Sequence, residues 1–231
     1  MGRAVFAKLA RQRRHDPGAL ISFFRLTVGV QWSALAAVAL TLVLDRGVSS
    51  GSIGLALPNW PAGAGPVLIS ASIGLAAAVA AGIVLGVRGA RSGTGLPVAP
   101  ESIAPMIPVT RTERYWAAAV AVGAGASEEL VFRGLLLAVA VGLGLHPVLA
   151  AAVLTVVFGA AHRYQGVGGV VTTTVFGAVM SAIALGTQSL LLPIVLHAAL
   201  DLRALLLTRP AVAPAWHGEG RATGPDRPAP E

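Results

Sequence analysis

Charge is scarce in this sequence. Only 12% of its residues are charged and 55% are hydrophobic, whereas a soluble domain carries about 25% charged residues. The few charges gather at the two ends of the chain and in a small number of loops. This composition excludes an ordinary water-soluble core and favours a bundle of membrane-spanning helices.

Cysteine is absent altogether. Its absence excludes disulfides, thiolate metal ligands, cysteine nucleophiles and thiol-linked lipid anchors, so a metal would have to be bound by His, Asp or Glu. Lysine is nearly absent too, with Lys8 alone, and arginine brings the net charge to +7. These arginines flank apolar runs and form no solvated basic face, so we expect membrane lipid as a partner and no nucleic acid.

Six apolar segments account for most of the chain, if about 20 residues make one crossing. They are Leu26–Leu44, Pro66–Val87, Arg111–Leu145, Pro147–His162, Val167–Leu185 and Leu190–Leu207. The sequence therefore predicts an all-α fold, a polytopic transmembrane helical bundle of about six spans.

The third segment is too long for one straight crossing at 1.5 Å per residue. Its small residues 123–127 predict a bend, after which Ser127 would cap a helix that restarts at Glu128. Tyr115 and Trp116 would then lie at the membrane interface. Gly82 and Gly86, in the second segment, form a small-xxx-small pair typical of close helix packing.

The organisation predicted along the chain has three parts. Residues 1–25 form a basic amino-terminal arm, residues 26–207 a transmembrane domain, and residues 208–231 a proline-rich tail that we expect to be disordered. The first apolar run exceeds the length of a secretory signal, so we interpret it as an uncleaved anchor. Basic residues sort to one side of the spans, which predicts that both termini are cytoplasmic. We expect the protein to lie in the plasma membrane of a bacterial cell.

Acidic and histidine residues interrupt the apolar spans at Glu128, Glu129, His162, His197 and Asp201. An ionised residue at the centre of a spanning helix costs at least about 2.5–3.5 kcal/mol, so such residues are rare without a function. Glu129 and Arg133, Phe158 and His162, and His197 and Asp201 are each four apart, so each pair shares one helix face. Because lipid cannot satisfy polar side chains, we expect the three faces to meet in a polar cavity.

Two kinds of chemistry fit these residues. Two imidazoles and a carboxylate are standard ligands for zinc, which lowers the pKa of a bound water toward about 7. Glu128, His162 and His197 are the candidate ligands for Zn²⁺ or another divalent metal. Without a metal, a desolvated glutamate could act as a base on a histidine-bound water. Both schemes deliver hydroxide to a carbonyl carbon, and the residues alone leave them open.

Three short motifs carry a resemblance to a known family. The segment 128–133, EELVFR, resembles the EExxxR motif of the CPBP (CAAX protease and bacteriocin-processing, or Abi) intramembrane proteases. The segment 158–162, FGAAH, is similar to their FxxxH motif, and 197–201, HAALD, to their HxxxN or HxxxD motif. The motifs occur in the family's order, one to a predicted span, within a core of residues 111–207.

The resemblance implies an endopeptidase that cuts near the cytoplasmic face. It assigns water activation to Glu128 and His162, and metal binding or oxyanion stabilisation to His197 and Asp201. Glu129 and Arg133 would form an orienting ion pair, with Phe158 as a supporting residue. The family is described by some as metalloproteases and by others as glutamate-dependent proteases.

The third motif ends in a departure from the eukaryotic CAAX-processing members, which carry asparagine where this chain has Asp201. An ionised carboxylate cannot donate to an oxyanion. Asp201 must therefore be protonated, bind a metal or orient His197. Prenylated CAAX proteins, bacteriocin-like peptides and signalling precursors all stay open as substrates, and the sequence gives no oligomeric state.

Two other classes of function use the same residues. A proton-coupled transporter could employ the acids and histidines as a relay, although no internal repeat typical of transporters is present. A non-catalytic, immunity-type scaffold could keep them for packing. Other intramembrane protease signatures, HExxH, GxSG and GxGD, are absent from the sequence, which favours the CPBP-type protease by exclusion.

Overall fold

The computed structural model describes residues 3–45, 47–59, 65–92, 95–210 and 214. The α-helices within them are α1 Arg3–Gln12, α2 Ala19–Leu44, α3 Gly65–Ser92, α4 Arg111–Glu129, α5 Leu136–Gly142, α6 Pro147–Ala161, α7 Gly166–Thr187 and α8 Leu191–Leu206. A π-helix, Leu130–Leu135, joins α4 to α5, and short 3₁₀ turns lie at Ala104–Met106 and Arg163–Gln165. No strand occurs in these ranges, only one isolated β-bridge. The all-α prediction is confirmed.

Every predicted span contains a helix. Three helical stretches of the described chain are long and apolar enough to cross a membrane: Ala19–Leu44, Ser72–Ser92 and Arg163–Thr187. Pro147–Ala161 is a shorter apolar helix. The prediction of a polytopic helical bundle is confirmed. That α4 with α5, and α8, also cross the membrane stays a prediction.

The outer helices turn large apolar side chains away from the protein. On α2, Val30 is 61% exposed, Trp32 67% and Val43 77%. Comparable exposure recurs on α3, α6 and α7. Apolar exposure on so many helices fits a surface covered by lipid rather than water.

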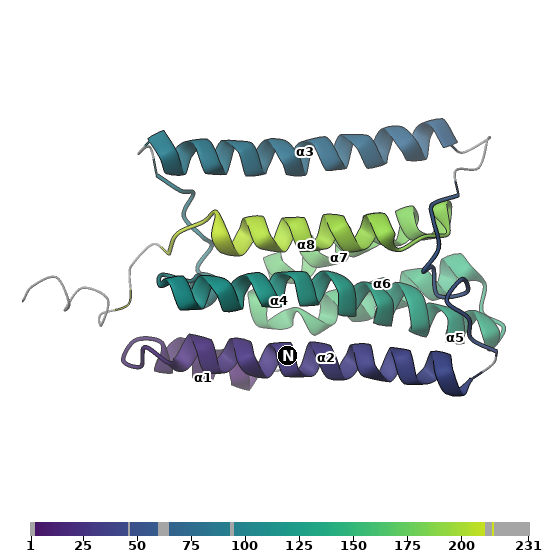
Figure 1. Cartoon of the computed structure of the whole chain (residues 1–231), viewed down its shortest axis with the longest axis horizontal. Helices are drawn as coiled ribbons and strands as arrows, with labels where there is room; N and C mark the ends of the chain where they lie inside the picture. The colour runs from purple at the N-terminus through teal and green to yellow at the C-terminus, as the bar shows by residue number, and fades with distance from the viewer. Residues whose placement is uncertain (1–2, 46, 60–64, 93–94, 211–213, 215–231) are drawn as a thin grey trace, which may run out of the picture.

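Helix α4 occupies the middle of the bundle. Figure 1 shows α2, α4, α8 and α3 side by side, with α6 and α7 behind them. Helix α4 packs against α8 and α2, and α6 against α7. Gly125 allows the backbones of α4 and α8 to approach closely, because a Cβ there would lie 2.8 Å from the backbone N of Ala198 and 2.8 Å from the carbonyl O of Ile194.

The bend predicted at residues 123–127 is wrong. Helix α4 runs unbroken through this stretch, and Ser127 is buried inside the helix rather than capping a new one. The glycines provide space for neighbours instead of breaking the helix. Gly123 faces the side chain of Gln31 on α2, whose Nε2 donates to the carbonyl O of Val120 at 3.0 Å.

The irregularity in this long helix lies further along, in the π-helix Leu130–Leu135. There the backbone N–H of Leu136 donates to the carbonyl O of Val131, five residues back rather than four. Such π segments are rare and often occur at functional sites. This one immediately follows Glu128 and Glu129.

The amino-terminal arm is tied to the start of α4. Arg13 forms a buried ion pair with Glu113, which is fully buried. Thr110 and Glu113 form a capping box at the same helix start. Glu113 is thus a buried acid outside the predicted site, and its contacts make it structural.

The small-xxx-small pair of α3 lies against α8. A Cβ on Gly82 would lie 2.5 Å from Nε of Arg203, and one on Gly86 would lie 3.1 Å from Cβ of Leu207. Beyond α8, Arg209 pairs with the segment at residues 96–99, through a bridge to Val98 and a bond from its Nε to the carbonyl O of Leu96. The rest of the predicted disordered tail, except residue 214, lies outside the described residues.

Candidate active site

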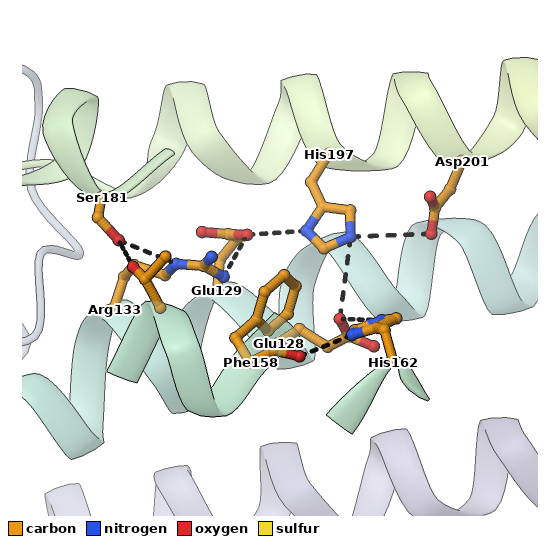
Figure 2. Close-up of polar contacts among 9 residues, drawn as sticks. Glu128, Glu129, Arg133, Phe158, His162, Ser181, His197 and Asp201 are labelled. Atoms are coloured by element: carbon orange, nitrogen blue, oxygen red, sulfur yellow. Dashed lines mark hydrogen bonds and ion pairs between the residues drawn. The ribbon is translucent and has the colours of Figure 1, made fainter. Parts of the chain in front are cut away.

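The structure brings the three acidic residues and the two histidines of the predicted site together. Glu128 and Glu129 end α4, His162 caps the carboxyl end of α6, and His197 and Asp201 lie one turn apart on α8 (Figure 2). Three polar faces that are separate in sequence therefore form one cluster between α4, α6 and α8.

Glu128 lies between the two histidines. Its Oε2 is 3.8 Å from Nε2 of His162 and 3.9 Å from Nε2 of His197. This oxygen is buried and has no hydrogen-bond partner among the described residues. A buried, unpaired carboxylate oxygen is costly, and separations just under 4 Å suit a water that hydrogen-bonds both groups.

Each histidine is held through its other ring nitrogen. Nδ1 of His197 is 2.7 Å from Oε1 of Glu129, and Nδ1 of His162 is 2.8 Å from the carbonyl O of Phe158. Both partners are acceptors, so each Nδ1 carries the hydrogen and donates it. Nε2 of each ring is therefore the nitrogen that can exchange a proton beside Glu128.

Glu129 and Arg133 form the ion pair under the cluster. Nη1 of Arg133 donates to Oε1 of Glu129 at 3.0 Å, and the side chains are 3% and 0% exposed. The Arg133 guanidinium also lies 4.2 Å from the centre of the Phe158 ring, a cation–π contact. Glu129 thus joins Arg133 to His197 through a single oxygen.

Helix α7 contributes two residues that sequence reasoning missed. Nε of Arg133 lies 3.5 Å from Oγ of Ser181, which is 3.1 Å from Oγ1 of Thr155 on α6. The ring of Phe176 packs edge-on against His197 at 5.1 Å. A serine and a phenylalanine in an apolar helix are ordinary residues, so no pattern in the sequence could have distinguished them.

Asp201 lies at the open side of the cluster. Its Oδ2 is 3.8 Å from Nε2 of His197, beyond hydrogen-bond range, and its side chain is 40% exposed. Glu129, rather than Asp201, makes the hydrogen bond that orients His197. Asp201 acts on this ring only as a nearby charge.

The candidate metal ligands lie further apart than the ligands of a zinc site. Two ligands bound to zinc at about 2.0–2.1 Å in tetrahedral geometry lie about 3.4 Å apart, whereas the closest separations here are 3.8–3.9 Å. No group of three or more His, Asp or Glu side chains in the described ranges is arranged to hold a metal ion. The donor types suit zinc, but their present spacing does not.

A comparison with protein families bears on this cluster. Residues 110–203 match the family model described as type II CAAX prenyl endopeptidase Rce1-like. The match covers less than half of the chain. The matched segment runs from the cap of α4 into the last turn of α8 and contains every residue of the cluster. It confirms the resemblance seen in the three motifs.

The Rce1-like family is one of CAAX-type proteases. The matched segment is therefore similar to a family of endopeptidases. Helices α1 to α3 lie outside the matched segment. Searches of curated proteins and of solved structures find no match to the chain.

Proposed function

We propose that this protein is an intramembrane endopeptidase in which Glu128 and His162 activate water for peptide-bond hydrolysis. The observation that carries the proposal is the unpaired Oε2 of Glu128, buried between the Nε2 atoms of two fixed imidazoles. A carboxylate in that position is a base without a structural partner. Glu129, by contrast, is occupied by Arg133 and His197.

In the proposed reaction a water molecule donates one hydrogen bond to Glu128 and another to Nε2 of His162. Glu128 removes a proton from this water as its oxygen attacks the carbonyl carbon of the substrate, which gives a tetrahedral oxyanion. Glu128 then passes the proton to the nitrogen of the scissile bond, which breaks to release an amine and a carboxylic acid. His162 positions the water through the ring orientation that the Phe158 carbonyl fixes.

His197 is placed to stabilise the oxyanion. Three carboxylates, Glu128, Glu129 and Asp201, surround it within 4 Å, against the one guanidinium of Arg133. When this ring is protonated, its Nε2–H points away from Glu129 toward the reaction centre and can donate to the oxyanion. In this scheme Asp201 need not donate a hydrogen bond, which makes an aspartate compatible with the reaction.

The test is peptide cleavage by the purified protein in proteoliposomes. Prenylated peptides ending in a CAAX sequence, and the same peptides without the prenyl group, serve as substrates, with the released carboxyl-terminal fragment measured by mass spectrometry. Glu128→Gln and His162→Ala should each lower kcat by about 10²–10⁴-fold, the usual contribution of acid–base catalysis. Glu101→Gln and His15→Ala, both exposed and remote in sequence, are matched controls that should leave kcat unchanged.

Cleavage that survives Glu128→Gln would refute the assignment of the base. A protein that cleaves neither peptide but carries a pH-driven ion flux in sealed vesicles would be the proton-coupled transporter instead. If only the prenylated peptides are cleaved, the substrates are CAAX proteins; if both are cleaved equally, the prenyl group is not recognised.

A further inference from the structure

A second feature lies on the opposite side of α8 from the cluster. A groove of about 580 Å³ runs between α3, α8 and the segment at residues 95–98. Its walls include Gly82, Leu85, Gly86, Val98, Arg203 and Leu207. Arg203 follows Asp201 by two residues, which turns its side chain about 200° around the helix. The groove therefore shares α8 with the candidate active site but faces away from it.

Arg203 supplies the positive charge of this groove. It is only partly exposed, and among the described residues no carboxylate pairs with its guanidinium, whereas Arg13 and Arg133 both have buried acidic partners. Its side chain lies directly over Gly82, where a Cβ would approach Nε to 2.5 Å. The glycine face of α3 thus makes room for a guanidinium that no acid in the described protein neutralises.

The other walls are apolar. Leu85 is 67% exposed and Val98 49% exposed, and Leu207 closes the groove from α8. More arginines surround this end of the two helices, with Arg88 and Arg91 both exposed on the last turns of α3 and Arg209 just beyond α8. A cation beside apolar walls, in a groove between membrane helices, is the arrangement that binds anionic lipid headgroups.

We propose that this groove binds one anionic glycerophospholipid, with its phosphate on Arg203 and the start of its acyl chains between Leu85 and Leu207. The guanidinium matches a phosphate diester because it offers two parallel N–H donors. The exposed leucine and valine side chains continue from the groove toward the lipid-facing surface of α3. A water-soluble anion would use the guanidinium and leave these apolar walls uncovered.

The experiment uses the full chain in phosphatidylcholine vesicles doped with a photoactivatable phosphatidylglycerol. After illumination, digestion and mass spectrometry locate the crosslinked peptides. Crosslinks should concentrate on residues 82–89 and 203–207. Arg203→Gln should lower their yield at least about five-fold, the factor expected for one headgroup contact. Arg91→Gln, which removes an exposed arginine outside the groove, is the matched control and should leave the yield nearly unchanged.

A second variant keeps the proposal testable if Arg203→Gln folds poorly. Val98→Glu places a negative charge at an exposed position of the groove wall and should lower the crosslink yield by a similar factor. Excess inorganic phosphate should not compete with the lipid; if it does, the groove is a site for free phosphate and the proposal is overturned. Equal crosslinking by a photoactivatable phosphatidylcholine, or an equal loss in Arg91→Gln, would overturn it as well.

Discussion

Replacing Arg133 by methionine tests how the cluster is held together. The substitution keeps much of the side-chain volume but takes the guanidinium away from the fully buried Glu129. Removing one partner of a buried ion pair costs about 3–5 kcal/mol, and the lost cation–π contact with Phe158 adds roughly 1 kcal/mol or more. The free energy of unfolding should therefore fall by at least about 3 kcal/mol.

The double variant Arg133→Met with Glu129→Gln separates charge from packing. Since it removes both charges, its unfolding free energy should recover by about 0.5–3 kcal/mol over the single variant. Its proteolytic activity should not recover, because Glu129 also orients His197. Unfolding is measured by denaturant titration in mixed micelles. Arg88→Met, at an exposed arginine of α3, is the control and should change stability by less than about 0.5 kcal/mol.

An Arg133→Met protein as stable as Arg88→Met would contradict the stabilising role of the ion pair. A double variant no more stable than the single one would contradict it as well. In either case Glu129 would not depend on Arg133, and the ion pair would be incidental to the cluster.

Three further predictions concern the site and its support. Asp201→Asn should change kcat by less than about ten-fold, because a charge 3.8 Å away and 40% exposed couples weakly to His197; a larger loss in the cleavage assay would give Asp201 a direct role. Gly125→Ala should cost about 1–3 kcal/mol in denaturant titrations, because its Cβ meets the backbone of α8. Gly74→Ala, whose Cβ meets nothing within 4 Å, should instead gain about 0.5–1 kcal/mol. Activity should survive prolonged chelation with no metal found by elemental analysis; stoichiometric zinc whose removal abolishes cleavage would refute the metal-free scheme.

The helices were largely predictable because apolar runs of membrane length leave a strong signal. The first span was predicted to begin at Leu26, and the helix begins at Ala19. Arg25 appeared to mark the boundary between the basic arm and the first span. It lies within α2 instead, and its guanidinium is 5.8 Å from the centre of the Trp116 ring on α4. A charge in sequence does not show whether a neighbouring helix offers it a partner.

The residues of the cluster were also predictable, because ionisable groups in apolar spans are too costly to lie apart. Their hydrogen bonds were not. The four-residue spacing suggested that Asp201 could orient His197, yet Glu129 makes that bond from another helix. Contacts between helices depend on how the helices rotate about their axes, and hydropathy does not specify that rotation.

The buried pair Arg13–Glu113 escaped prediction for a related reason. Both residues lie among other charges. Arg13 was interpreted only as part of the basic arm, and Glu113, at the start of the third segment, was not singled out. Only their contact in three dimensions distinguishes them from solvated neighbours.

The π-helix Leu130–Leu135 lets the chain hold one residue more at this point than a regular α-helix would, because its bonds run to the fifth residue back rather than the fourth. If one residue were deleted there, the backbone could return to regular α-helical bonding, and α5 would keep roughly its present orientation about the helix axis. A deletion in the regular part of α4 would instead turn Glu128 and Glu129 by about 100° relative to the start of that helix. Shortening the chain should therefore be tolerated better inside the π-helix than in the α-helix before it.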